Sequence, residues 1–342
     1  MRLKLYKIKK PFIIAELSAN HNGNIKNIFK LIDEAKNCGA HAVKIQSYTA
    51  DSMTLNCKNK HFYIRDGLWK GNFLYDLYKK GTTPFGWHKK IFSYAKKKKL
   101  LCFSTPFDLK SVHLLEKLKT PIYKIASFEI NHIPLLEAIG KTKKPVIVST
   151  GMASHADIKL ALKILKKNGT KDIVLLHCIS SYPALPENYN LNFINALTRK
   201  HKSPVGLSDH TKGNLVAICS VALGVRIFEK HIKLNTEKGL DAKFSTNCKE
   251  FKNYVRDINR SFASLGSKNF NRNKVEGLSK KHRRSIFICK DVKKDDLITN
   301  DNISIIRPSN GLHPKYLKEV LRKKFKNNFQ MGKPLRIQDV CS

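Results

Sequence analysis

Short runs of apolar, mostly β-branched residues alternate along the chain with longer segments in which apolar residues recur every three to four positions. The runs have the length of strands, and segments such as IKNIFKLIDEAKNCG and HADIKLALKILKKNG have the period of amphipathic helices. Both of these segments end at a glycine, Gly39 and Gly169, where a left-handed residue stops a helix. The pattern predicts eight strands, at residues 12–17, 42–46, 100–105, 122–127, 145–150, 172–178, 203–209 and 226–232.

Strands that alternate with helices form parallel β/α units, and eight such units predict an α/β protein with a (β/α)8 TIM barrel. The last unit ends near residue 265, which agrees with the roughly 250 residues of a typical barrel. A basic stretch, GSKNFNRNKVEGLSKKHRR, and several short strand-like pieces follow. We therefore predict a barrel domain at 1–265, a linker at 266–284 and a small β-rich domain at 285–342.

The long excursion between the second and third predicted strands, residues 47–99, contains the aromatic-rich stretch HFYIRDGLWKGNFLYDLY. It is too long for a plain barrel connection. Two roles fit it equally well, as a cover of the site or as packing against the outer helices.

Several predicted strands carry ionisable residues at their carboxyl ends, where barrel enzymes place their chemistry. These residues are Lys44, Lys124, His210 and His231. A buried charge without a partner costs several kcal/mol, so such residues indicate a shared polar site. Alternate residues of a barrel strand face the interior. The pairs expected to face it together are Lys44 with Gln46, Ser208 with His210, and Glu229 with His231.

The chain is strongly basic, with 65 lysines and arginines against 26 aspartates and glutamates and a formal net charge of +39. Such a field attracts nucleic acid and other polyanions. The lysines recur along the whole chain, and the densest tracts lack interleaved aromatics on which bases would stack. We therefore expect a solvated basic surface rather than a specific nucleic-acid groove, and keep a basic nucleic-acid-binding protein as the alternative from another class.

The eight cysteines are scattered, without a Cys-x-x-Cys pair or zinc-like Cys/His spacing. This spacing favours reduced thiols in a cytoplasmic protein. The apolar run near the N-terminus is too short for a signal-peptide core, and no apolar stretch approaches the roughly 18 residues of a membrane helix. The sequence predicts a protein with no membrane partner.

Six motifs at the ends of the predicted strands resemble the sialic acid synthase family in the expected order. They are IIAELSANHNG, KIQ, KIAS, STGM, SDHT and EKH. The C-terminal stretch RRSIFICKDVKKDDLITNDNISIIRPSNGL resembles the antifreeze-like (SAF) domain of the same family. The resemblance implies an enzyme, a transferase that condenses phosphoenolpyruvate with the open-chain aldehyde of an acetamido sugar and releases phosphate.

The resemblance also implies roles for particular residues. Those that match the phosphoenolpyruvate site are Lys44, Lys124, Ser127, Ser149 and Ser208. Any one of these serines, taken alone, is as well explained by a hydroxyl bonded to nearby backbone. Glu16 matches a catalytic carboxylate, which would orient the attacking water or exchange protons with the intermediate.

His210 and His231 match a pair that binds a divalent metal, which would polarise the aldehyde and make both histidines part of the catalytic set. A lone histidine is more often a core residue, but two facing inward on adjacent strands favour ligands. Imidazole, water and substrate oxygens suit Mn, Co, Fe or Zn, and the resemblance alone favours Mn2+.

The sugar site is implied by the remaining matches, which are Gln46, Glu129, Tyr182, Asp241 and Arg307. In this family the arginine of the antifreeze-like domain reaches the sugar in the other subunit, so the resemblance implies a domain-swapped homodimer. Glu229 is expected to neutralise Lys124 or orient His231, with a structural salt bridge as the alternative.

Within the family, the segments GLWKGNFLYDLYKKGTTPFGWHKKIF and GLDAKFS look more like pseudaminic acid synthases than N-acetylneuraminic acid synthases. The sugar would then be 2,4-diacetamido-2,4,6-trideoxy-altropyranose, for which a more apolar site is expected. Leu240 stands where the family usually has proline, and Ser180 where neuraminate synthases tend to have asparagine. N-acetylneuraminic or legionaminic acid synthesis is the alternative within the same chemistry.

Overall fold

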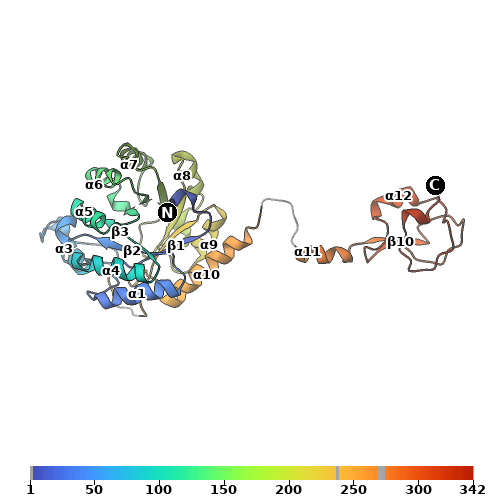
Figure 1. The fold of residues 1–342 in the computed structure, drawn as a ribbon, viewed down its shortest axis with the longest axis horizontal. Helices are drawn as coiled ribbons and strands as arrows, with labels where there is room; N and C mark the ends of the chain where they lie inside the picture. The colour runs from blue at the N-terminus through green and yellow to red at the C-terminus, as the bar shows by residue number, and fades with distance from the viewer. Residues whose placement is uncertain (1–2, 236–238, 268–273, 342) are drawn as a thin grey trace. The chain divides into compact units, whose positions relative to one another are not determined.

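In the computed structural model, the eight predicted strands form a closed parallel barrel in chain order (Figure 1). Each predicted strand is present, with ends that differ by a few residues. Their bounds are β1 Phe12–Glu16, β2 Ala42–Ser47, β3 Leu101–Pro106, β4 Tyr123–Ile125, β5 Val146–Ser149, β6 Ile173–His177, β7 Val205–Asp209 and β8 Ile227–His231. The predicted (β/α)8 fold is confirmed.

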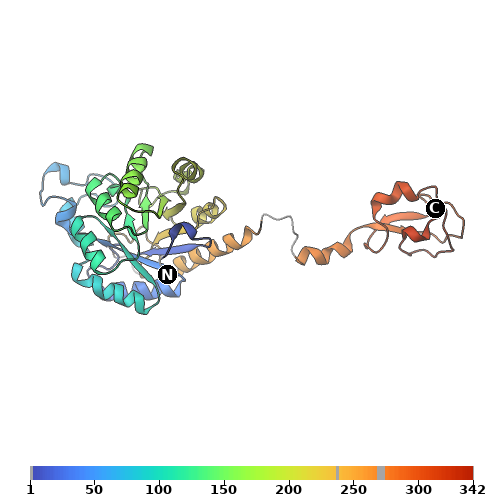
Figure 2. The same cartoon turned by 45° about the horizontal axis from the view of Figure 1, so that its top comes forward.

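Helices form an outer layer around the strands (Figures 1 and 2). Their bounds are α1 Ile25–Asn37, α2 Ala50–Met53, α3 Leu74–Gly81, α4 Phe85–Lys97, α5 Leu109–Lys117, α6 Ile133–Lys141, α7 His155–Lys167, α8 Phe193–His201, α9 Leu215–Ala222 and α10 Cys248–Ser264. Short 3-10 helices are η1 Leu5–Lys7, η2 Lys60–Phe62, η3 Ser127–Glu129 and η4 Pro186–Tyr189. The excursion between β2 and β3 thus contains α2, η2 and α3 before the barrel helix α4.

Local chemistry sets the helix ends. Ser154 and Asp157 form a capping box at the start of α7, which satisfies backbone N–H groups of its first turn. Gly39 and Gly169 follow α1 and α7 with φ of 89° and 111°, so both predicted glycine stops are confirmed.

The structure describes residues 3–235, 239–267 and 274–341. By internal contacts the chain divides into two compact units, Met1–Gly266 and Ser267–Ser342. The predicted boundaries of the linker, 266–284, stay a prediction, and part of that linker lies outside the described residues. Within the described parts of the chain, no helix is both long and apolar enough to span a membrane.

The second unit has its own small core, formed by residues such as Ile286, Ile298, Phe325 and Leu335. Two antiparallel strands, β9 (Ser285–Ile288) and β10 (Ile303–Ile306), contribute to it. Its elements are α11 Lys274–Ser279, η5 Lys280–His282, β9 Ser285–Ile288, β10 Ile303–Ile306, η6 Pro314–Tyr316, α12 Leu317–Val320 and η7 Ile337–Asp339. The predicted small β-rich domain is therefore present, although most of its described residues lie outside helices and strands.

The barrel interior is filled in two levels. At the amino ends of the strands an apolar cluster packs together, including Phe12, Ile14, Phe103 and Ile227. Two residues beyond Ile14 on β1 and Ile227 on β8, the inward positions are polar and are occupied by Glu16 and Glu229. Alternate positions of one strand therefore give both the packed floor of the barrel and its polar site.

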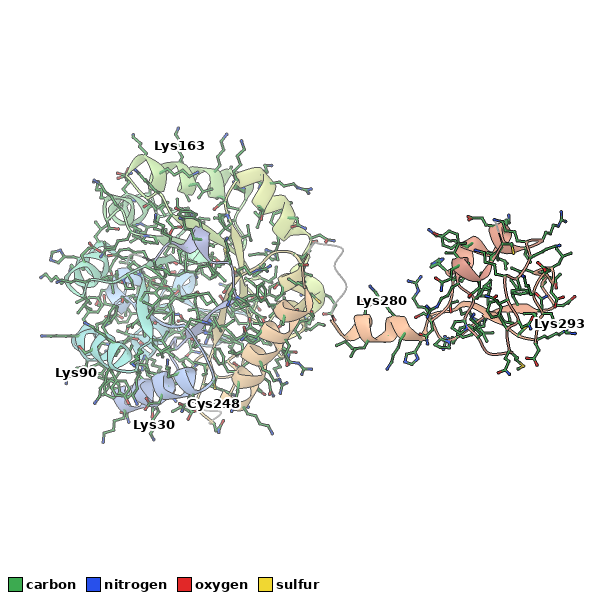
Figure 3. All side chains as sticks on the ribbon, turned by 45° about the vertical axis from the view of Figure 1, so that its right-hand side comes forward. Lys30, Lys90, Lys163, Cys248, Lys280 and Lys293 are labelled. Carbon is green, nitrogen blue, oxygen red and sulfur yellow. The ribbon has the colours of Figure 1, made fainter. Side chains whose placement is uncertain are left out.

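Many of the chain's lysines lie on the surface. Lys30, Lys90 and Lys163 are exposed and project outward from α1, α4 and α7 (Figure 3). Lys280 and Lys293 are exposed on the second unit. The positive charge is thus spread over the molecule, as expected for a solvated basic surface.

Candidate active site

Two lysines and two glutamates form a buried ionic cluster at the carboxyl ends of the strands. Lys44 Nζ lies 2.5 Å from Glu16 Oε2 and 3.5 Å from Glu229 Oε1. Lys124 Nζ lies 3.4 Å from the same Glu229 oxygen. The β1–β2 register places Glu16 directly opposite Lys44, whereas Glu229 reaches both lysines from β8. When all four groups are ionised, their charges cancel.

Burial and pairing act on the pKa values of this cluster in opposite directions. Burial raises the pKa of Glu16 to about 7, although attraction to Lys44 opposes this. Burial also disfavours ionised Glu229, but the two lysines outweigh it and hold the pKa of Glu229 below its ordinary value. Burial lowers the pKa of Lys124, whereas attraction to both glutamates overcomes burial and raises the pKa of Lys44. Near neutral pH, Glu16 can therefore exchange a proton while Glu229 stays the counter-charge of the lysines.

The three predicted serines lie at the ends of β4, β5 and β7, and all are buried. Ser149 Oγ has no hydrogen-bond partner among the described residues. Ser127 Oγ accepts a hydrogen bond from Gly151 N at 3.1 Å, and Ser208 Oγ lies 3.4 Å from His210 Nε2. Ser149 thus offers a free hydroxyl donor, the type of group that an anion requires.

The backbone at Gly151 lies so close to a group of polar side chains that a Cβ there would force at least one of them to move. A Cβ at this position would lie 2.3 Å from Ser180 Oγ, 3.0 Å from Cys178 Sγ and 3.1 Å from Ser127 Oγ. Cys178, whose Sγ lies 3.3 Å from Ser127 Oγ, was not among the predicted site residues. Its signal was its position, because it continues the inward-facing series of Val174 and Leu176 on β6.

His210 and His231 lie together, with ring centroids 5.5 Å apart. His210 Nδ1 lies 2.8 Å from the carbonyl oxygen of Ile179, which can only accept, so Nδ1 carries the proton and Nε2 keeps a lone pair. Nδ1 of His231 is buried and has no hydrogen-bond partner within the described residues. Burial lowers the pKa of both histidines, so both imidazoles are neutral and able to act as ligands.

Aromatic side chains line the histidine pair. Tyr182 lies 4.6 Å from His210 and Phe244 lies 4.9 Å from His231, measured between ring centroids. Trp69, from the excursion, lies 5.8 Å from Tyr182, and its Nε1 donates a hydrogen bond to Leu240 O at 3.1 Å. The excursion therefore covers this side of the site, and Trp69 is held there by the backbone carbonyl of residue 240.

Two of the predicted sugar-binding residues adjoin the ionic cluster. Gln46 Nε2 donates to Glu16 Oε1 and to Ser18 Oγ, both at 3.3 Å, and Ser18 in turn bonds Asp241. Burial raises the pKa of Asp241 above its ordinary value.

Glu129 and Arg307 differ in their surroundings. Burial raises the pKa of Glu129 to about 7, against the attraction of Lys124, and its Oε2 has no hydrogen-bond partner in the described parts of the chain. Arg307 is exposed on the second unit and belongs to none of the barrel contacts described above. The structure thus gathers the predicted residues of the barrel, while the role of Arg307 stays a prediction.

Buried lysines, carboxylates and neutral histidines at the carboxyl end of a closed parallel barrel define an enzyme of the TIM-barrel class. Comparison with known families gives the particular group. Residues 31–270 match the NeuB family and residues 283–340 match the SAF domain. The chain belongs to the NeuB family, and the expected resemblance to sialic acid synthases is confirmed.

Similar proteins cover nearly the whole chain. A pseudaminic acid synthase of Campylobacter jejuni (strain 81-176) is 41% identical over 97% of both chains. A pseudaminic acid synthase of Helicobacter pylori is 39% identical over 97% of this chain and 98% of its own. Among solved structures, the N-acetylneuraminic acid synthetase of Leptospira borgpetersenii in complex with citrate is 33% identical, with a TM-score of 0.71 over 82% of this chain and 95% of its own.

Proposed function

We propose that the chain is a pseudaminic acid synthase, which joins phosphoenolpyruvate to 2,4-diacetamido-2,4,6-trideoxy-altropyranose. Carbon 3 of phosphoenolpyruvate forms a bond to the aldehyde carbon of the open-chain sugar. Water then adds at carbon 2 and gives a tetrahedral intermediate. The bond between carbon 2 and the oxygen that carries the phosphate breaks, and inorganic phosphate leaves. The observation that carries this proposal is the buried Lys44–Glu16–Glu229–Lys124 cluster beside two neutral histidines.

The lysine cluster suits phosphoenolpyruvate because it holds two cations in a site that is largely shielded from solvent. An ammonium in such a site binds phosphate or carboxylate oxygens strongly. Glu229 pairs with both lysines before the substrate arrives and keeps them in place. Glu16 takes or returns a proton at the reacting centre, since its pKa of about 7 makes both forms available.

The histidine pair fits a divalent metal. His231 Nδ1 is a buried nitrogen without a described partner, and His210 Nε2 keeps its lone pair. No group of three or more His, Cys, Asp or Glu side chains in the described ranges is arranged to hold a metal ion, so two imidazoles would leave positions for water and substrate oxygens. When bound, a divalent cation, Mn2+ in our proposal, supplies the Lewis acidity that polarises the aldehyde.

Two observations support the choice of sugar: the aromatic side chains beside the histidine pair and the similarity to pseudaminic acid synthases. Trp69, Tyr182 and Phe244 give an apolar surface beside the histidines, which suits a sugar that lacks its terminal hydroxyl and carries a second acetamido group. The two pseudaminic acid synthases are similar along almost the full length of the chain.

We also infer a domain-swapped homodimer in which Arg307 of the partner subunit reaches the sugar. Large apolar side chains in the segments that follow β4 to β7 support an interface there, because they are exposed in the single chain. They are Phe128, Met152, Leu185 and Leu215. We expect such a dimer to work in the cytoplasm with no specific nucleic-acid partner.

Phosphate release from phosphoenolpyruvate, with Mn2+ present, tests the main proposal. We expect turnover with the diacetamido trideoxy altrose that exceeds turnover with N-acetylmannosamine and with the legionaminic acid precursor. A higher rate with either of the other sugars would keep the reaction and refute the choice of sugar. No turnover with any of them would refute the reaction itself.

Mixing two inactive variants tests the shared site. The Glu16→Gln and Arg307→Ala variants are unfolded together and refolded as a mixture. If Arg307 acts in the partner's barrel, each mixed dimer has one intact site. Because about half of the dimers are mixed, roughly a quarter of the native activity should return. Activity that stays at the level of the separate variants would refute the domain swap.

A further inference from the structure

Asp209 and Lys230 occupy a particular place relative to the histidine pair. Asp209 directly precedes His210 in the sequence and Lys230 directly precedes His231. The two are Cα partners in the β7–β8 ladder. Because residues alternate along a strand, the histidines face the barrel interior while Asp209 and Lys230 face the outer layer.

This pair is one of the most deeply buried ion pairs described in the chain. Lys230 Nζ lies 3.1 Å from Asp209 Oδ2, and both side chains are fully inaccessible to solvent. The ring of Tyr254, from α10, lies 5.1 Å from the ammonium. A buried ion pair is poor evidence for stability, because apolar residues of similar volume often do as well. The reason for this ion pair is therefore sought in the other groups that Asp209 and Lys230 contact.

The pair holds the turn that carries His210. Lys230 Nζ donates hydrogen bonds to the carbonyl oxygens of Thr211, at 2.5 Å, and Gly213, at 3.2 Å. Asp209 Oδ1 accepts from the backbone N–H and the hydroxyl of Thr211, at 2.9 and 2.7 Å. An apolar side chain at position 230 would lose the side-chain bonds that tie this turn to β8. An apolar side chain at position 209 would lose the bonds that brace the turn at Thr211. The backbone ladder between β7 and β8 would remain in both cases.

We propose that Asp209 and Lys230 are a positioning pair, which fixes the separation and orientation of His210 and His231 from behind the strands. This inference rests on the proposed metal role of the histidines. Neither residue belongs to the predicted site, and neither touches the ionic cluster in any described contact. Groups that orient metal ligands in this indirect way commonly change metal affinity about 10- to 100-fold when they are removed.

The test compares Mn2+ binding with phosphoenolpyruvate binding in Lys230→Met, Asp209→Asn and the double variant. The double variant leaves no unpaired buried charge, so it is expected to fold even if a single variant does not. Lys144→Met is the matched control. Lys144 also makes an ion pair, with Glu116 at 2.5 Å, and lies over an aromatic ring, that of Tyr123, but it precedes β5 and is remote from the histidines in the chain.

We expect Mn2+ affinity, measured by electron paramagnetic resonance on the folded protein, to fall at least tenfold in the double variant. Phosphoenolpyruvate affinity without metal should stay within about threefold of native, and the control should change neither. A folded double variant that binds Mn2+ like the native protein would overturn the inference. A parallel loss of both affinities would also overturn it, since the pair would then act on the fold in general. Native protein that binds no Mn2+, even with phosphoenolpyruvate, would refute the proposed metal role and this inference together.

Discussion

Replacing Lys44 by methionine removes one of the two cations expected to hold phosphoenolpyruvate, with little change in side-chain length. In the free site Lys44 pairs with Glu16 and Glu229, at 2.5 and 3.5 Å. Without it, Lys124 alone faces two carboxyl groups. The site would then have one cation fewer for an anionic substrate, whether Glu16 stays ionised or takes up a proton.

The size of the effect follows from the type of bond that is lost. A hydrogen bond to a charged group contributes about 1.5 to 3 kcal/mol net. At 1.4 kcal/mol for each tenfold change, the dissociation constant of phosphoenolpyruvate should rise about 10- to 150-fold. Stability should fall less than the 3 to 5 kcal/mol of a typical broken buried pair, because Glu16, with its pKa already about 7, takes up a proton when Lys44 is gone.

Calorimetric titration of phosphoenolpyruvate, without sugar or metal, measures this change directly. Lys98→Met is the matched control, since it removes a partly exposed lysine that pairs with Asp33 at 2.6 Å on the outer helices. It should leave the dissociation constant unchanged. A folded Lys44→Met variant whose affinity stays within threefold of native would show that Lys44 does not bind the substrate.

Three further predictions concern other parts of the barrel. His210→Ala should abolish stoichiometric Mn2+ binding and turnover, and full activity of the native enzyme after chelation would contradict a metal role. Trp69→Ala should lower kcat/KM for the diacetamido sugar roughly tenfold without changing phosphoenolpyruvate affinity. An unchanged kcat/KM for this sugar would exclude Trp69 from its recognition. His88 lies fully buried on α4, and burial lowers its pKa from 6.5 to about 4. Because the unfolded chain then binds the proton more readily, about 3 kcal/mol of stability should be lost as pH falls from 6.5 to 4. Urea unfolding of His88→Asn should lack this loss; equal pH dependence in both proteins would refute it.

The period of the apolar residues was enough to predict the barrel and the strand-end lysines and histidines of its site. The roles of other residues, such as Glu16 and Asp241, were implied only by the family resemblance. Eight runs of strand length gave the eight strands, and alternation along β2 and β8 correctly placed Lys44 and Glu229 in the interior. These features are local: they depend on which face of a strand a side chain takes, and the sequence contains that information.

Contacts that cross the barrel could not be predicted in the same way. One oxygen of Glu229 pairs with both Lys44 and Lys124. Whether it can reach both depends on the strand tilt and on the diameter of the closed barrel. Trp69 reaches the site from an excursion without a regular period, so no pattern indicated which of its aromatics would face inward. Cys178 was predictable from its position directly after β6, in line with the inward-facing Val174 and Leu176.

The contrast between a charge-balanced interior and a basic exterior has a consequence for the speed of encounter. Outward-facing lysines such as Lys30, Lys90 and Lys163 surround a barrel whose internal cluster has no excess charge when fully ionised (Figure 3). With a formal net charge of +39, the long-range field draws in an anionic substrate before any specific contact forms. Added salt, which shortens the screening length to about 3 Å at 1 M, should therefore slow the capture of phosphoenolpyruvate much more than it slows the bond-forming step that follows.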